Sequence, residues 1–323
     1  MKRISTILML VIFTVILGAC GNVDSKNNTT EVNNKNNDGE QLVFGFTAMT
    51  MNNPFFQSLE ESVREEVEAN GDKLITTDPQ LDVSLQINQI EDMISQGIDA
   101  IFLNPVDWEG IKPALQMLED ANIPIINYDT EVKDFEYVTA FIGSDNKNAG
   151  YVAGEDLVKR FPDGGKIAVI DTPTMNSIND RIDGFFEAIE GVDFEVVAQQ
   201  NGEGNLETAL GIAEDILIAN PDIVAIMGGN DPIALGALAA AKATNNSDVI
   251  IYGVDGSPEA KTEISEGSQL VGTGAQSPIN IGKFSVEVGY KVLNGEEFDE
   301  RTPVETFLIN EDNVDEYGTD SWQ

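Results

Sequence analysis

Apolar residues follow one repeating pattern along most of this chain: short continuous apolar runs alternate with longer segments in which they recur at helical spacing. One helical segment has Val83, Ile87, Ile90 and Ile94 in register and ends at Gly97. Apolar runs between such segments are typical of parallel strands buried on both faces. The number of runs favours two sheets of about five strands over one sheet, and therefore an α/β fold of two doubly wound, Rossmann-like lobes. The predicted strands are 42–46, 74–76, 99–103, 124–127, 139–142, 166–170, 194–198, 223–227, 248–252 and 269–272.

Residues 50–56 join the first predicted strand to the first predicted helix. Asn53 is placed to cap that helix, with Pro54 at its first position. Ligands of open α/β sheets bind at the carboxyl ends of the strands, so Asn53, Phe55 and Phe56 are candidate ligand contacts. The alternative is that both rings belong to the core and the asparagine only caps the helix.

The first forty residues differ in composition from the rest of the chain. Residues 1–19 combine Lys2 and Arg3 with an apolar stretch and a Leu-Gly-Ala sequence before Cys20, which resembles the signal peptide of a bacterial lipoprotein. Cys20 would then carry the lipid, and the polar residues 20–40 would form a disordered tether. An ordinary secretory signal is the alternative. Because Cys20 is the only cysteine, the chain excludes an internal disulfide, a thiolate metal cluster and a cysteine nucleophile.

The composition excludes one class of partner. The formal net charge is −38, and it becomes −40 once Lys2 and Arg3 are removed. Nucleic-acid binding requires clustered cations on the protein, so nucleic acid is not expected as a partner.

Polar side chains follow almost every predicted strand, and their chemistry is uniform. They are amides, carboxylates, a hydroxyl and a guanidinium, in a chain with no histidine. Sugar hydroxyls both donate and accept hydrogen bonds, which suits such groups, and the apolar faces of sugars pack on aromatic rings. The pattern therefore predicts a sugar site, with no metal and no cofactor. The polar residues that follow the predicted strands include Asn53, Asn104, Asp129, Ser144, Asn146, Arg181, Asn230, Asp255 and Gln276.

Several sequence blocks occur in an order that closely resembles the ribose- and galactose-type sugar-binding proteins of ABC importers. They include Asn-Asn-Pro-Phe-Phe, Asn-Pro-Val-Asp, Ser-Asp-Asn, Asp-Arg-Ile-Asp-Gly-Phe, Gly-Asn-Asp-Pro and Gly-Val-Asp-Gly-Ser-Pro. The resemblance covers about residues 41–310. It implies the type I periplasmic-binding-protein architecture, in which two lobes joined by three hinge crossings close around the ligand.

The resemblance also divides the chain. It implies a first lobe of residues 41–144 and 276–302 and a second lobe of residues 145–275 and 303–312, followed by an acidic tail, 313–323. The expected hinge crossings are 143–146, 273–277 and 294–303.

The same resemblance implies that these nine polar residues form the pocket together with Phe55 and Phe56, and it has three departures. Thr130 stands where the ribose binders have arginine, residues 201–205 offer no ring to cover the second face of the sugar, and Val254 replaces a phenylalanine. These losses make ribose itself doubtful as the ligand. Trp108 is a candidate for the missing ring, and the alternative is that it packs at the start of a helix.

The expected function is therefore capture of a monosaccharide or polyol, as a monomer, for an ABC permease and its ATPase. A receptor for a chemotaxis or two-component sensor system is the main alternative. A glycosidase using two carboxylates remains open in principle, but the resemblance favours a binder without enzymatic activity. A sugar-responsive repressor would need a basic DNA-binding head, and an export signal stands in that place.

Overall fold

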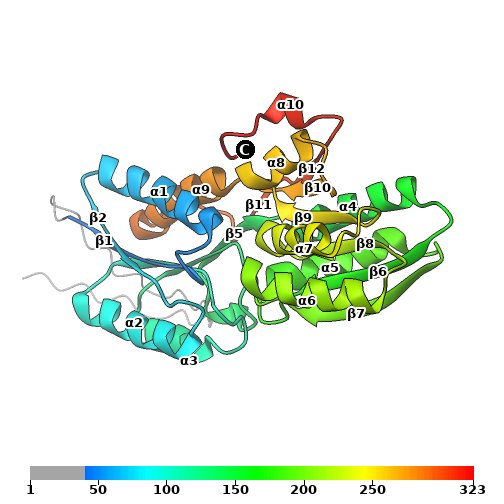
Figure 1. Ribbon diagram of the computed structural model, residues 1–323. Coiled ribbons are helices and arrows are strands. Elements are labelled where there is room, and N and C mark those ends of the chain that lie inside the picture. The colour runs from blue at the N-terminus through cyan, green and yellow to red at the C-terminus, as the bar shows by residue number, and fades with distance from the viewer. Residues whose placement is uncertain (1–40) are drawn as a thin grey trace, which may run out of the picture. The chain divides into compact units, whose positions relative to one another are not determined.

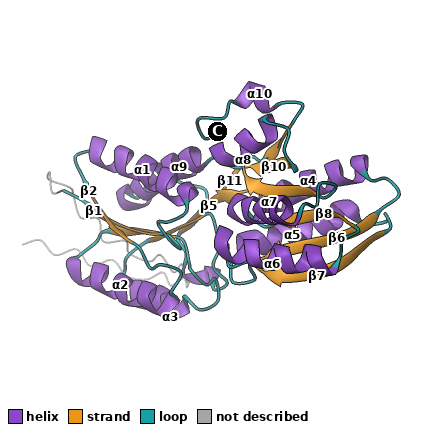
Figure 2. Ribbon diagram, viewed as in Figure 1, coloured by secondary structure: helices purple, strands orange, loops and turns teal. Residues whose placement is uncertain are grey.

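The computed structural model describes residues 41–323, in which two six-stranded sheets are each covered by helices on both faces (Figures 1 and 2). The two-lobed α/β fold predicted from the sequence is confirmed. The predictions for residues 1–40, including the export signal, Cys20 and the tether, lie outside the described residues.

The first sheet is entirely parallel, with the strand order β11-β5-β4-β3-β1-β2. Helices α1 and α9 pack together on one face, and α2 and α3 cover the other (Figure 1). A short 3-10 helix, η1 (Phe135–Tyr137), precedes β5. The strands are β1 (Val43–Thr47), β2 (Lys73–Thr77), β3 (Ala100–Leu103), β4 (Ile125–Tyr128), β5 (Ala140–Ser144) and β11 (Arg301–Val304). The helices are α1 (Pro54–Ala69), α2 (Val83–Gln96), α3 (Lys112–Asp120) and α9 (Pro278–Asn294).

The second sheet has the order β12-β10-β9-β8-β6-β7, and only β12 is antiparallel to its neighbour. Helices α4 and α5 pack on one face, and α6, α7 and α8 share a hydrophobic core on the other. The strands are β6 (Gly165–Asp171), β7 (Phe194–Asn201), β8 (Ile223–Gly228), β9 (Ile250–Asp255), β10 (Leu270–Ala275) and β12 (Phe307–Asn310). The helices are α4 (Asn146–Arg160), α5 (Asn176–Ile189), α6 (Leu206–Ala219), α7 (Asp231–Thr244), α8 (Pro258–Ser265) and α10 (Val314–Tyr317).

Local sequence signals set the ends of the helices that matter for the site. The side chain of Asn53 accepts a hydrogen bond from the main-chain N–H of Phe55 at 2.9 Å, so this asparagine caps α1 as predicted. Gly97 ends α2 in the left-handed conformation, with φ of 78°, which a residue without a Cβ atom adopts at little cost. All ten predicted strands are present.

The chain passes between the two sheets three times. The passages lie between β5 and α4, between β10 and α9, and between β11 and β12. The expected lobe boundary between residues 302 and 303 falls inside β11, whose Pro303 and Val304 pair with Gly143 and Ser144 of β5. The third passage is therefore at residues 305 and 306, later in the chain than the crossing expected at 294–303.

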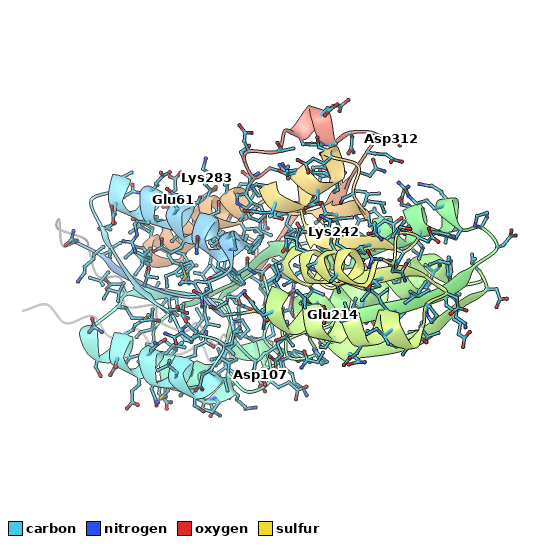
Figure 3. The ribbon with its side chains drawn as sticks, viewed as in Figure 1. Glu61, Asp107, Glu214, Lys242, Lys283 and Asp312 are labelled. Carbon is cyan, nitrogen blue, oxygen red and sulfur yellow. The ribbon has the colours of Figure 1, made fainter. Side chains whose placement is uncertain are left out.

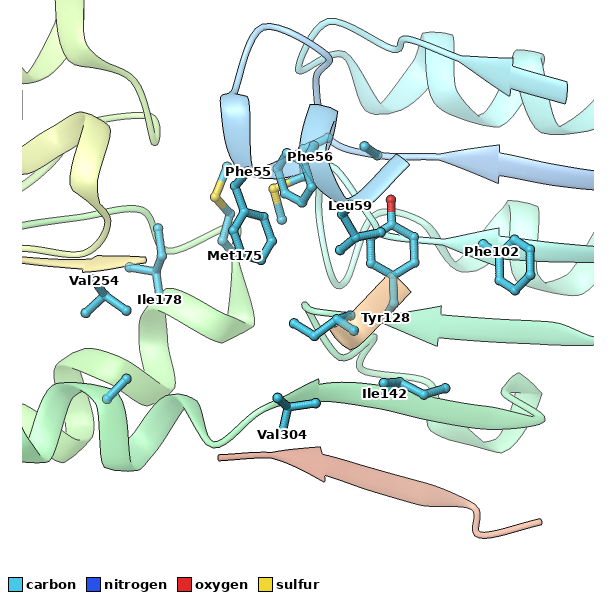
Figure 4. Close-up of a cluster of buried hydrophobic side chains, with 14 of the residues drawn as sticks. Phe55, Phe56, Leu59, Phe102, Tyr128, Ile142, Met175, Ile178, Val254 and Val304 are labelled. Carbon is cyan, nitrogen blue, oxygen red and sulfur yellow. The ribbon is translucent and has the colours of Figure 1, made fainter. Parts of the chain in front are cut away.

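Residues 313–323 are part of the folded structure. Val314 is buried in the core of the second lobe, and Trp322 packs against the hydrophobic cluster that contains Phe55. Figure 4 shows that cluster, in which Phe55 and Phe56 belong to the first lobe and Met175 and Ile178 to the second. Charged side chains such as Glu61 and Lys283 lie instead on the outer surfaces of the helices (Figure 3). None of the helices described has the length and apolar character needed to cross a bilayer.

Candidate ligand-binding site

A cavity of about 620 Å³ lies where the carboxyl ends of the two sheets meet. Its size is in the range of small-molecule sites. Both lobes contribute to the wall, because α1 and the end of β4 come from the first lobe, and α5, α7 and the end of β9 come from the second. The structure brings eight sequence-predicted candidates to this wall: Asn53, Phe55, Phe56, Asp129, Arg181, Asn230, Asp255 and Gln276.

The first turn of α1 supplies the apolar part of the wall. The rings of Phe55 and Phe56 are only 2% and 4% exposed and meet edge to face, with centroids 5.3 Å apart. Both rings are thus core residues, as the alternative interpretation proposed, yet both also line the cavity. Pro54 and the Asn53 cap fix the direction in which this turn leaves β1.

Asp129 lies at the end of β4 in the left-handed conformation, with φ of 58°. Asn104, at the end of β3, donates a hydrogen bond from Nδ2 to Oδ2 of Asp129 at 2.9 Å. Burial raises the pKa of Asp129, and the charge of Arg181 and the Asn104 hydrogen bond oppose that shift. Asn104 is fully buried beside the wall and therefore positions the carboxylate.

Arg181 holds together the polar residues that the second lobe contributes to the site. It is 3% exposed on α5, and its Nε donates to Oδ1 of Asn146 at 2.8 Å. Its Nη1 donates to the carbonyl oxygen of Gly229 at 3.0 Å and lies 3.5 Å from Oδ1 of Asp255. Asn146 is thus behind the wall and orients the guanidinium, while Ser144 is buried at the end of β5.

Asp255 ends β9 and accepts a hydrogen bond from Nε2 of Gln276 at 2.8 Å. Burial raises the pKa of Asp255 to about 8. Arg181 opposes this shift, whereas the charges of Asp231 and Asp129 add to it. Asp231, which was not among the candidates, is fully buried behind the wall and accepts hydrogen bonds from Thr273 Oγ1 and Ser257 N, each at 2.7 Å.

Asn230 has a structural task in addition to its place in the wall. Its Oδ1 accepts from the main-chain N–H of Ile233 at 2.9 Å, which caps α7, and its Nδ2 donates to the carbonyl oxygen of Gly204 at 3.1 Å. Both atoms of this amide are therefore engaged within the protein.

Four polar atoms of candidate residues are buried without a hydrogen-bond partner in the described part of the chain. They are Asn104 Oδ1, Asp129 Oδ1, Ser144 Oγ and Gln276 Oε1. Three of them can only accept hydrogen bonds, and two belong to residues of the cavity wall. Because an unpaired buried polar atom costs about 1–3 kcal/mol, the arrangement favours a ligand that donates hydrogen bonds.

Sequence reasoning missed part of the wall. Met175, Ser177 and Ile178 enter it from the loop after β6 and the start of α5, a position that a search for residues directly following strands does not reach. Trp322 also lines the cavity, although it lies beyond the stretch in which the sequence blocks were found. Trp108 does not line the cavity that residues 41–323 form. Nζ of Lys133 lies 5.6 Å from the centroid of the Trp108 ring.

Comparison with known proteins agrees with this geometry. A family profile described as "Periplasmic binding protein domain" matches residues 44–297. The ribose import binding protein RbsB of Escherichia coli is 33% identical over 261 residues, which cover 80% of this chain and 88% of that protein.

Solved structures agree in fold over most of the chain. A solute-binding protein of an ABC transporter from Mycobacterium smegmatis, with bound glycerol, has a TM-score of 0.83 and 32% identity, covering 88% of this chain and 99% of its own. One from Bacillus halodurans, with bound myo-inositol, has a TM-score of 0.81 and 31% identity, covering 87% of this chain and 98% of its own. This chain belongs to the periplasmic binding protein family.

Proposed function

We propose that this chain captures a small sugar or polyol between its two lobes and delivers it to the permease of an ABC importer. The observation that carries the proposal is the pair of buried acceptors in the cavity wall, Asp129 Oδ1 and Gln276 Oε1, that have no donor within residues 41–323. Hydroxyl groups of the ligand can donate hydrogen bonds to these two acceptors, and hydroxyl oxygens of the ligand can accept hydrogen bonds from Arg181. The rings of Phe55 and Phe56 suit the apolar CH face of the same ligand.

The relatives support this class of ligand. RbsB is a ribose import protein, and the two structural neighbours hold glycerol and myo-inositol. The ligands have adjacent hydroxyls in common, but differ in size and ring type. The proposal accordingly names small polyhydroxylated molecules and no individual sugar, in a binding protein without enzymatic activity.

Calorimetric titration of the purified chain with D-ribose, D-allose, myo-inositol and glycerol tests the proposal. We expect at least one of them to bind with a Kd in the micromolar range or below, equivalent to about −8 kcal/mol or stronger. Asp129→Asn keeps the shape of the side chain but replaces one carboxylate oxygen, which accepts hydrogen bonds, by an NH2 group, which only donates them. This variant should therefore bind the ligand more weakly. A folded chain that gives no heat with any of the four would contradict the proposal.

We also infer that the chain works outside the cytoplasm, as a monomer tethered by a lipid on Cys20. The Leu-Gly-Ala-Cys sequence supports the lipid, and a cavity wall formed by a single chain supports the monomer. Cys20→Ser should move the protein from the membrane fraction of the producing cells to the soluble fraction. Equal membrane retention of the variant would contradict the lipid anchor.

A further inference from the structure

Trp322 forms part of the cavity wall although it is far along the chain from the other wall residues. Trp322 lines the cavity, and its ring meets that of Phe55 edge to face, with centroids 5.8 Å apart and planes at 79°. Phe55 in turn meets Phe56 in the same manner. The three rings form one aromatic cluster along the wall.

The segment of residues 321–323 is held by contacts on both sides of Trp322. Nζ of Lys261, on α8, donates to the carbonyl oxygen of Ser321 at 2.5 Å. Lys261 is 0% exposed, and burial lowers its pKa. Oγ of Ser277, at the passage between β10 and α9, donates to the carbonyl oxygen of Gln323.

These anchors show that Trp322 is positioned and not a loose side chain. A buried ammonium group is costly unless it finds an acceptor, so Lys261 and the main chain at Ser321 stabilise each other. Lys261 belongs to the second lobe, whereas Phe55 belongs to the first. The segment is therefore anchored on the second lobe and at a passage between the lobes, and its indole ring contacts the first lobe.

The chemistry of the ring matches what the rest of the wall lacks. Residues 201–205 and Val254 provide no ring from the second lobe, where Met175 and Ile178 are the apolar wall residues near α5. An indole offers a large apolar face together with one N–H donor, which suits the CH surface and the oxygens of a cyclic polyol.

We propose that Trp322 contacts the ligand and is a specificity-determining residue, which selects molecules with a ring-sized apolar face over smaller polyols. The inference rests on the proposed function and names the part of the wall that sets ligand size. Loss of the indole should weaken the binding of cyclic ligands more than the binding of glycerol.

Calorimetry of Trp322→Ala with D-allose, myo-inositol and glycerol tests this selectivity. We expect the Kd of each cyclic probe that binds to rise about tenfold or more, and that of glycerol to change less than about threefold. Trp322→Phe should recover part of the loss. Tyr317→Ala is the matched control, because it removes a ring from α10 outside the cavity wall and should leave every Kd unchanged.

Fluorescence gives a second measurement, since the chain has two tryptophans and Trp108→Phe leaves Trp322 as the only one. Saturation with a bound cyclic probe should shift the Trp322 emission. Lys261→Met, which removes the anchor of Ser321, should move the emission of the ligand-free protein to longer wavelength and raise the Kd of the same probe.

The outcomes separate the two proposals. If a cyclic probe binds and Trp322→Ala leaves its Kd within about twofold, or lowers the affinity for glycerol equally, the inference is overturned while the proposed function stands. If the folded chain binds none of the probes, the proposed function falls and this inference falls with it.

Discussion

At the scale of single residues, Arg181 decides how the buried charges of the site are balanced. Three buried carboxylates, Asp129, Asp231 and Asp255, share the field of this one guanidinium, which opposes the rise in pKa of each. Its Nε and Nη1 are directed by Asn146 and Gly229, so the planar group has a fixed orientation. A lysine would keep the charge and lose that orientation.

We therefore expect Arg181→Lys to weaken ligand binding by about thirtyfold, or about 2 kcal/mol. The ammonium group of lysine keeps the charge but lacks the several N–H donors that the planar guanidinium holds in a fixed orientation. Calorimetry with the best-binding sugar measures the change. Arg160→Lys is the control, since Arg160 pairs with Asp156 at 2.7 Å away from the cavity. An unchanged Kd in Arg181→Lys would show that ligand binding does not depend on the guanidinium.

The raised pKa of Asp255 predicts how stability depends on pH. The folded protein holds a proton on Asp255 up to a pKa of about 8, well above the ordinary carboxyl value near 4, so between these values the folded state binds more protons than the unfolded state. This group therefore makes the free energy of unfolding fall as pH rises from 5 to 8. The loss is up to about 1.4 kcal/mol per pH unit.

Asp255→Asn should flatten that decline, because the amide does not titrate. Urea unfolding at pH 5, 6, 7 and 8 measures it. Asp222→Asn serves as the control: Asp222 is exposed, and its hydrogen bond with Lys166 lowers its pKa, so its removal should leave the slope in this range unchanged. Parallel curves for the wild type and Asp255→Asn would mean that Asp255 is ionised throughout.

Whether a wall residue could be predicted from the sequence depended on its position in the fold. Side chains at the ends of strands, such as Asp129 and Asp255, could be predicted because parallel strands bring their carboxyl ends to one edge of the sheet. Trp322 could not be predicted, because its position depends on hydrogen bonds from Lys261 and Ser277, which are distant in the sequence and which no local pattern reveals. Trp108 was plausible because it is near Asn104 in the sequence, but it is not one of the residues that line the cavity.

At the scale of elements, the close crossing of α4 and α5 positions Asn146 and Arg181. A Cβ atom at Gly150 of α4 would overlap the carbonyl oxygen of Arg181, and one at Gly184 of α5 would overlap that of Lys147. Each helix thus carries a glycine where the backbone of the other approaches. The distance between these helices sets the contact between Asn146 and Arg181.

Gly150→Ala should therefore separate the two helices, destabilise the protein by about 1–3 kcal/mol and weaken ligand binding. Gly211→Ala is a matched control within α6, where an added Cβ meets no atom within 4 Å. It should stabilise the protein by about 0.5–1 kcal/mol and leave binding unchanged. Urea unfolding and calorimetry test both variants. Equal stabilities would contradict the close crossing.

The elements themselves were largely predictable, and the exceptions have a common cause. Most of the ten strands between crossover helices are apolar runs, because both faces of each sheet are covered, although the edge strand β7 is mostly exposed. Strands β11 and β12 have four residues each, and β11 contains Arg301 and Pro303 at the edge of its sheet. The polar residues and proline of β11 and the shortness of both strands hide them from a search for apolar runs, and both form because the adjacent sheet offers them a partner.

At the scale of the whole molecule, the function requires that the two lobes open to admit a ligand and close around it. Two hydrogen bonds join the lobes away from the hinge passages. Thr130 Oγ1 and Ser177 Oγ lie 2.7 Å apart, and the main-chain N–H of Trp108 donates to the carbonyl oxygen of Thr174 at 3.1 Å. Neither contact survives a large separation of the lobes, so both belong to the closed state.

This geometry predicts that the closed state can be trapped. Replacing Thr130 and Ser177 together by cysteines places two thiols where two hydroxyls are in contact, and oxidation should link the lobes. The oxidised double variant should release a bound sugar at least about tenfold more slowly than the reduced protein, because release requires opening. Stopped-flow exchange of the best-binding sugar measures the rate, and each single-cysteine variant controls for the substitution itself. If the disulfide is demonstrated by mass and the release rate is unchanged on reduction, the ligand does not leave by separation of the lobes, and closure is not what holds it.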